Sequence, residues 1–255
     1  MTLFGQPWDL LLIAAVLGIV VPWRGVTRVR ALLSRADLRT TDRLVMYAST
    51  IAFQWLATGL TVWRCLARGW NPTDMGLALE HTVRTILVGV AIAFVLAIFQ
   101  VLGIRQMART PVSQQGILWQ LSRKLMPQNA VESFAFIALV STVSVCEEFL
   151  YRGFAFGLFR QLWSAGTAAL LGSSLLFAIG HLYQGRRGVI STFFLGLIFA
   201  ATRAWTGNIV PGIIAHFVVD LIAGLLGPRM LRSVPAASEA DGDSGTAYLL
   251  AIHIT

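Results

Sequence analysis

The residues best suited to chemistry are ionisable side chains inside apolar runs of the second half of the chain. An ionisable group within an apolar membrane segment is energetically costly and therefore marks a functional site by default. Six such residues group into three motifs: Glu147, Glu148 and Arg152 in SVCEEFLYRGF, His181 at the end of SSLLFAIGH, and His216 with Asp220 in GIIAHFVVDLIAG.

The two adjacent glutamates face different surroundings on a helix. Glu148 and Arg152 are one turn apart, so we expect an ion pair between them. This pair could be purely structural, fixing a helix junction. Glu147 points about 100° away and is left without a partner, which suits a general base.

The histidines allow two interpretations each. His181 shares a helical face with Phe177, and His216 shares one with Asp220, which could orient its ring. A histidine at a helix end and a polar pair between helices can both be structural. Taken together, however, three consecutive helical regions bring acid and imidazole groups into the bilayer, and this predicts a polar cavity between the C-terminal helices that can activate water.

Composition indicates the elements that must position these groups. Of 255 residues 56% are hydrophobic and 13% charged, too few charges to cover a soluble protein of this size. Membrane-spanning backbone must satisfy its own hydrogen bonds, so long apolar runs predict helices. We expect an all-α, polytopic transmembrane bundle of about eight spans, or seven if the fourth and fifth runs join. The runs are 8–23, 44–63, 85–104, 131–150, 151–163, 166–182, 188–205 and 208–227.

The sequence predicts one structural domain with three parts. Residues 1–130 carry N-terminal spans and basic loops, residues 131–227 form the catalytic core, and residues 228–255 form a mostly disordered tail. The two cysteines, Cys65 and Cys146, lie near apolar runs and are expected to be small buried hydrophobes.

The formal net charge of +8 comes from arginines between the apolar runs, which favours contact with anionic lipid over nucleic acid. Loops 24–43 and 105–130 are strongly basic and are therefore expected to be cytoplasmic, with an amphipathic surface helix in the second. Arg186 and Arg187 do not fit this orientation.

The three motifs, in this order, resemble a known family. EEFLYRGF matches E-E-x-x-x-R, FAIGH matches F-x-x-x-H, and HFVVD matches H-x-x-x-[N/D]. These are signatures of the CPBP family of CAAX proteases and bacteriocin-processing enzymes, also called the abortive-infection or type II CAAX prenyl endopeptidase family. The motifs cover 147–220, and the hydropathy pattern extends the resemblance over 131–227.

The resemblance implies an intramembrane endopeptidase that cuts a membrane-associated peptide or protein. It implies that Glu147 activates the attacking water with help from His181, and that His216 and Asp220 stabilise the oxyanion. The prenyl protease branch has Asn at the position of Asp220, so we expect Asp220 to hold His216 in its donating form. Glu148, Arg152 and Phe177 would support the site.

The resemblance leaves the cofactor open. Zinc held by Glu147, His181 and His216 is one option, and metal-free water activated by glutamate is the other. The absence of H-E-x-x-H excludes an ordinary zincin helix.

The preference for arginine over lysine points to a multi-pass protein of a bacterial plasma membrane. Prenylated substrates are not expected in bacteria. Bacterial relatives are associated with peptide maturation and bacteriocin immunity. The main alternative is a non-catalytic membrane scaffold or immunity protein. A proton-coupled transporter is a third interpretation, since membrane carboxylates and histidines also relay protons.

Overall fold

The computed structural model describes residues 7–77, 82–110 and 116–232. In these ranges the regular structure is helical, apart from one isolated bridge between Leu77 and Asn208. The elements are α1 (Trp8–Ala15), η2 (Val16–Val20), α2 (Val21–Leu33), α3 (Thr40–Ala67), α4 (Thr82–Arg109), α5 (Gly116–Leu125), α6 (Ala130–Glu148), η4 (Phe149–Ala155), α7 (Phe156–Trp163), α8 (Gly166–Gly180), η5 (Leu182–Gln184), α9 (Gly185–Thr206), α10 (Val210–Leu225) and α11 (Gly227–Arg232).

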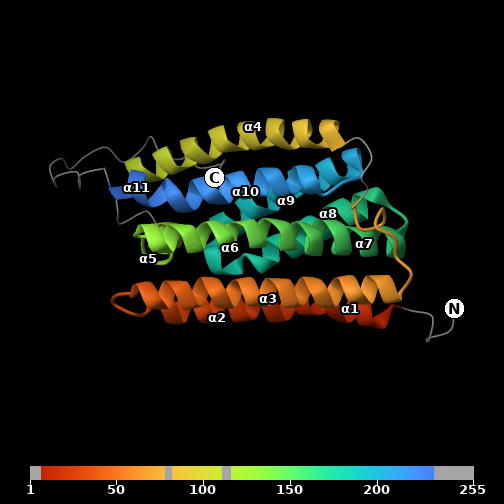
Figure 1. Cartoon of the computed structure of the whole chain (residues 1–255), viewed down its shortest axis with the longest axis horizontal. Coiled ribbons are helices and arrows are strands. Elements are labelled where there is room, and N and C mark those ends of the chain that lie inside the picture. Colours follow the sequence, from red (N-terminus) through yellow and green to blue (C-terminus); the bar gives the residue numbers. More distant parts are fainter. Residues whose placement is uncertain (1–6, 78–81, 111–115, 233–255) are drawn as a thin grey trace.

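The long helices run along a common direction (Figure 1). Helices α3, α6, α10 and α4 contact one another in that order across the bundle, while α8 and α9 pair and pack on α7 and α10. The continuous helix α1–η2–α2 packs against α3 and α8. This arrangement confirms the predicted all-α membrane bundle.

Among the described residues, six helices are long and apolar enough to cross a membrane, fewer than the seven or eight spans expected. Runs 131–150 and 151–163 form one continuous helix of 34 residues, Ala130–Trp163. Run 166–182 forms α8, whose 15 residues rise only about 22 Å, short of a bilayer core of about 30 Å. The structure therefore replaces the expected count with six long helices and one short apolar helix.

The first span is also longer than its apolar run. Its helix continues to Leu33, so Arg24, Arg28 and Arg30 lie on α2 rather than in a loop. The π-helical segment η2 precedes Pro22, which has no N–H to give to the preceding turn. The second π-helical segment, η4, directly follows Glu148, and such turns occur often at functional sites.

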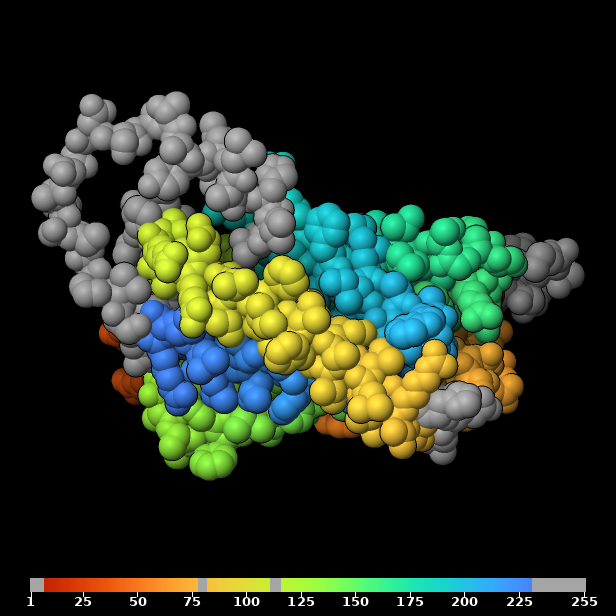
Figure 2. All heavy atoms as spheres, turned by 90° about the horizontal axis from the view of Figure 1, so that it is seen from above, coloured from red at the N-terminus to blue at the C-terminus, as the bar shows by residue number. Residues whose placement is uncertain are grey.

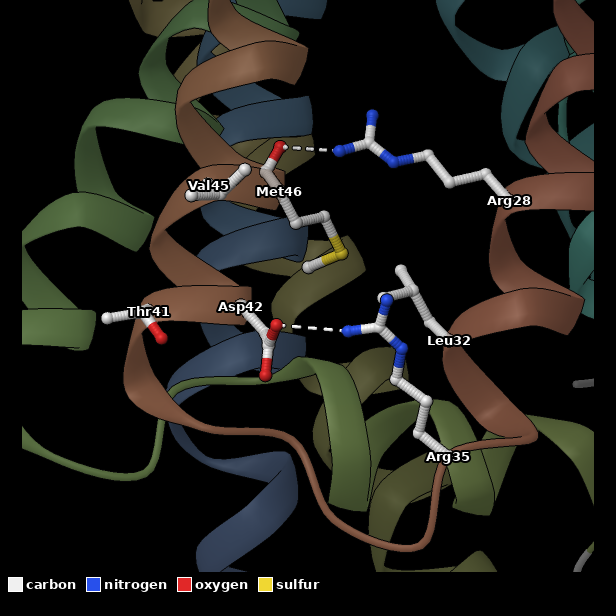
Figure 3. Close-up of a pocket in the computed structure, with 7 residues that line it drawn as sticks. All are labelled: Arg28, Leu32, Arg35, Thr41, Asp42, Val45 and Met46. Carbon is white, nitrogen blue, oxygen red and sulfur yellow. Dashed lines mark hydrogen bonds and ion pairs between the residues drawn. The ribbon is translucent and has the colours of Figure 1, made fainter.

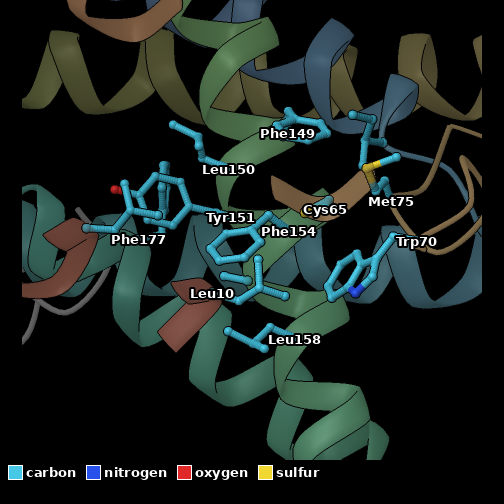
Figure 4. Packing of buried hydrophobic residues seen from close by; sticks show 13 residues of the cluster. Leu10, Cys65, Trp70, Met75, Phe149, Leu150, Tyr151, Phe154, Leu158 and Phe177 are labelled. Carbon is cyan, nitrogen blue, oxygen red and sulfur yellow. The ribbon is translucent and has the colours of Figure 1, made fainter. Parts of the chain in front are cut away.

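The main hydrophobic cluster surrounds η4 and joins it to α1, the end of α3 and α8 (Figure 4). Phe154 and Leu158 are fully buried in this cluster, Leu10 joins it from α1, and Phe177 of α8 packs on Tyr151. Both cysteines are free and fully buried, as predicted. Element η4, which directly follows Glu148, is thus held by packing from both halves of the chain.

Helix α4 covers one face of the bundle and lies over α10 (Figure 2). Its outer side chains are large, apolar and exposed, as a lipid-facing helix requires. They include Val83, Leu87, Val90, Phe94, Phe99 and Leu102.

One end of the bundle collects most of the basic segments. Element η5 and the start of α9, which carries Arg186 and Arg187, contact α2 and α5. These arginines therefore lie at the same end as the basic helix α2 and helix α5, and the conflict expected from the sequence disappears because runs 131–150 and 151–163 form one helix, which removes one crossing. Helix α5 forms within the segment predicted to be amphipathic. Of the tail predicted to be mostly disordered, 228–255, residues 228–232 lie on α11, so the prediction is wrong there, and the remaining residues lie outside the described ranges.

Candidate active site

Helix α6 delivers the glutamate pair to the middle of the bundle. It begins at Ala130 because the side chain of Asn129 accepts the backbone N–H of Glu132 at 2.9 Å, a typical N-cap. From there Glu147 lies about 26 Å along the helix, at a rise of ~1.5 Å per residue. The adjoining η4 carries Arg152, one turn after Glu148, and Arg152 Nη1 lies 3.0 Å from Glu148 Oε1.

Glu147 has a partner that the sequence did not suggest. Gln54, buried on α3, donates its side-chain N–H to Glu147 Oε1 at 2.9 Å. Glu147 Oε2 is buried, has no hydrogen-bond partner within the described residues, and lies 3.9 Å from His181 Nε2. The expectation that Glu147 lacks a partner is therefore wrong for one oxygen, because α3 packs on α6.

The end of α8 fixes the ring of His181. The His181 backbone N–H bonds to the carbonyl of Ala178, and its ring Nδ1 lies 2.8 Å from the carbonyl oxygen of Phe177. A carbonyl only accepts, so Nδ1 carries a proton, and in the neutral form of the ring Nε2 presents a lone pair toward Glu147. In that form two acceptors face each other across 3.9 Å.

Glu148 forms the predicted ion pair with Arg152, at 3.0 Å, and both side chains are fully buried. Arg152 Nη2 also donates to the carbonyl of Gly196 on α9, at 3.2 Å. Its guanidinium lies over the Phe177 ring at 4.1 Å. These extra contacts offset the cost of removing the pair from water.

His216 joins α10 to this pair. Its Nδ1 lies 3.1 Å from Glu148 Oε1, and its Nε2 lies 3.5 Å from Asp220 Oδ2. Each ring nitrogen faces a carboxylate oxygen, which can only accept when ionised, so the arrangement favours a ring that donates from both sides. The Phe199 ring stacks on His216 and holds its plane.

Two glycines allow these helices to approach. A Cβ on Gly212 would lie 2.5 Å from Glu148 Oε2, and a Cβ on Gly196 would lie 3.3 Å from Arg152 Nη2. Any side chain at Gly212 would displace the carboxylate that His216 contacts.

The predicted residues thus gather into two neighbouring groups that share Phe177. Glu147 and His181 form one, completed by Gln54; Glu148, Arg152, His216 and Asp220 form the other. Phe177 contacts both histidine rings, with centroids 4.6 Å from His181 and 5.8 Å from His216. Gln54 was missed because it is uncharged, although an amide within the apolar run 44–63 was a usable signal.

The zinc option stays a prediction. Within the described residues, no three His, Cys, Asp or Glu side chains are arranged to hold a metal ion. The reason lies in His216, whose two ring nitrogens face Glu148 and Asp220 rather than the gap between Glu147 and His181.

Two surface cavities open elsewhere on the molecule. One, of about 250 Å³, lies between α2 and α3, and the other, of about 530 Å³, lies near Arg160 and Arg203. Neither is lined by the site residues. Glu147 and His181 are nevertheless not sealed, since their side chains remain 15% and 14% exposed. The predicted cavity between the C-terminal helices stays a prediction.

Comparison with known proteins identifies the region that carries the site. Residues 129–222 match the family described as type II CAAX prenyl endopeptidase Rce1-like. No curated protein and no solved structure matches the chain. The matched segment extends from the cap of α6 to beyond Asp220, so it includes all three motifs but not Gln54. The match of residues 129–222 agrees with the family resemblance that the three motifs indicate.

Proposed function

We propose that this protein is an intramembrane endopeptidase that hydrolyses a peptide bond with a water molecule activated by Glu147 and His181. The observation that carries the proposal is the open pair of acceptors, Glu147 Oε2 and His181 Nε2, 3.9 Å apart. A water oxygen about 2.8 Å from each would donate one hydrogen to each acceptor and present its lone pairs outward.

The reaction follows from these positions. As the water oxygen attacks the carbonyl carbon, its proton passes to Glu147 Oε2. When the C–N bond breaks, the leaving nitrogen receives that proton, and the products are a carboxyl group and an amine. Gln54 holds Oε1 at 2.9 Å, so that the other oxygen keeps its direction toward the water.

The second group would support this chemistry. We infer that His216 helps to stabilise the oxyanion on the carbonyl oxygen through the positive charge of its ring, since both ring nitrogens already face the carboxylates of Glu148 and Asp220. Glu148 and Arg152 keep α6, α9 and α10 in register around it. The proposed reaction uses no metal ion, because the side chains of Glu147, His181 and His216 do not converge on one point.

The substrate class follows from the position of the site. Glu147 lies deep within a helix of 34 residues that can cross a membrane, so the scissile bond must enter from the bilayer or its surface. We infer a membrane-associated peptide or protein. This class includes, but is not limited to, the prenylated proteins for which the family is named.

The test compares protein N-termini in membranes from source cells that lack the chain and are complemented with either wild type or Glu147→Ala. We expect new N-termini only with wild type, and their uncut precursors with the variant. Equal amounts of folded protein, checked by gel filtration and thermal unfolding, are the control. The same new N-termini in Glu147→Ala membranes would favour the alternative of a non-catalytic scaffold or immunity protein.

A further inference from the structure

A cleft of about 250 Å³ lies between α2 and α3 at the basic end of the bundle, away from Glu147 (Figure 3). One wall comes from α2 and the residues that follow it, the other from the start of α3. The lining residues are Arg28, Leu32, Arg35, Thr41, Asp42, Val45 and Met46.

Two arginines reach into this cleft from the same side. Arg28 Nη2 donates to Ser49 Oγ at 2.6 Å and to the Met46 carbonyl at 3.4 Å, and Arg35 Nη1 pairs with Asp42 Oδ1 at 3.0 Å. These bonds fix the positions of the guanidinium groups. Each guanidinium carries five N–H donors, so further donors remain for a ligand. Two cations against one carboxylate leave the cleft with a net positive charge, so it is suited to an anion.

Apart from Thr41, the rest of the lining is apolar. Leu32, Val45 and Met46 form the apolar part, and Val45 is 66% exposed. Arg28 lies about 8 Å inside the end of α2, at ~1.5 Å per residue, and Arg35 lies just beyond that end. The cleft therefore spans the level at which phospholipid headgroups meet their acyl chains.

We propose that this cleft binds an anionic glycerophospholipid. Arg28 and Arg35 would hold the phosphate, and an acyl chain would lie along Leu32, Val45 and Met46. Basic pockets between membrane helices select anionic headgroups, because the positive charge is placed where the headgroup phosphate lies. The bound lipid joins α2 to α3 and stabilises the folded protein by mass action.

The experiment measures lipid binding to the full chain in neutral detergent, by native mass spectrometry and thermal unfolding. The probes are phosphatidylglycerol, phosphatidylcholine and inorganic phosphate. We expect phosphatidylglycerol to bind and to raise the unfolding temperature. Equal binding of phosphatidylcholine would overturn the role of charge, and equal stabilisation by inorganic phosphate would overturn the lipid as the ligand.

Two double variants then test whether the lipid binds in this cleft. Arg28→Gln with Arg35→Gln should weaken phosphatidylglycerol binding about 25-fold, because each arginine near the headgroup contributes about fivefold. The matched control, Arg30→Gln with Arg105→Gln, removes the same charge from exposed positions outside the cleft. Equal weakening by both pairs would show diffuse attraction and overturn the proposal.

A third variant covers the case in which loss of Arg28 prevents folding. Val45→Trp fills the apolar half of the cleft from an exposed position and removes no charge. We expect it to fold and to lose phosphatidylglycerol binding. Undiminished binding in a folded Val45→Trp protein would overturn the assignment of the cleft.

Discussion

Two buried carboxylate clusters on α6, one at each end of the helix, satisfy their oxygens differently. At the start, Glu132 Oε2 accepts from Arg43 Nε at 2.8 Å and from the Gln128 backbone N–H at 2.7 Å, while Oε1 accepts from Asn129 at 2.9 Å. At the end, Glu147 and Glu148 each bond through Oε1 only, and both Oε2 atoms have no hydrogen-bond partner among the described residues.

This difference distinguishes Glu132 from the two carboxylates of the candidate site. Both oxygens of Glu132 accept hydrogen bonds, so neither is left unsatisfied, and its bond with Arg43 fixes the start of α6 to α3. An unsatisfied buried oxygen is uncommon in proteins and calls for an explanation. At Glu147 our proposal explains it as a position kept open for the reacting water.

Replacing Glu147 by Gln tests the comparison most strongly. The amide keeps the size of the side chain but cannot take the proton, so the cleavage rate should fall roughly 10²- to 10⁴-fold. The free energy of unfolding should hardly change, because no ion pair is lost. Rates of cleavage and denaturant unfolding curves on the same purified sample measure both. A near-normal rate would remove Glu147 from the reaction.

Arg43→Met tests the structural cluster. It leaves the fully buried Glu132 without its cation and should lower the free energy of unfolding by about 3–5 kcal/mol. Cleavage per folded molecule should stay close to normal. Detergent-denaturation curves measure the loss, and Arg105→Met, an exposed arginine of α4, is the matched control. If both variants unfold alike, Glu132 is not held as described.

Gln54→Leu probes the bond between α3 and Glu147. A hydrogen bond to a charged group contributes about 1.5–3 kcal/mol, so the cleavage rate should fall roughly tenfold to a hundredfold. Thr50→Val, one turn earlier on α3, keeps the shape of the helix and should leave the rate unchanged. Loss of stability with an unchanged rate would make Gln54 a packing residue.

Asp220→Asn should have the smallest effect. Asp220 lies 3.5 Å from His216 Nε2 with a side chain 36% exposed, and pairs of this kind contribute about 0–1 kcal/mol. An Asn oxygen can still accept from the ring, so we expect a rate decrease of at most about fivefold. Cleavage kinetics measure the change, and a loss as large as that of Glu147→Gln would give Asp220 a direct role.

The sequence predicted the parts of the fold and site that depend on local pattern. The apolar runs predicted an all-α membrane bundle, and the spacing of Glu148 and Arg152 predicted an ion pair one turn apart, which the structure confirms. Span boundaries were predicted less well, because hydropathy does not show that the helix continues through η4 or that α8 stops after 15 residues.

The sequence by itself therefore determined the membrane class and the candidate residues, since composition and helical spacing act over a few residues. Only the tertiary structure decided how these residues are divided between the two groups of the candidate site. It brought Gln54 to Glu147 across 93 positions of sequence and Glu148 to His216 across 68. Contacts over such distances depend on which helices pack together and on the space left by Gly212, and no local pattern contains that information.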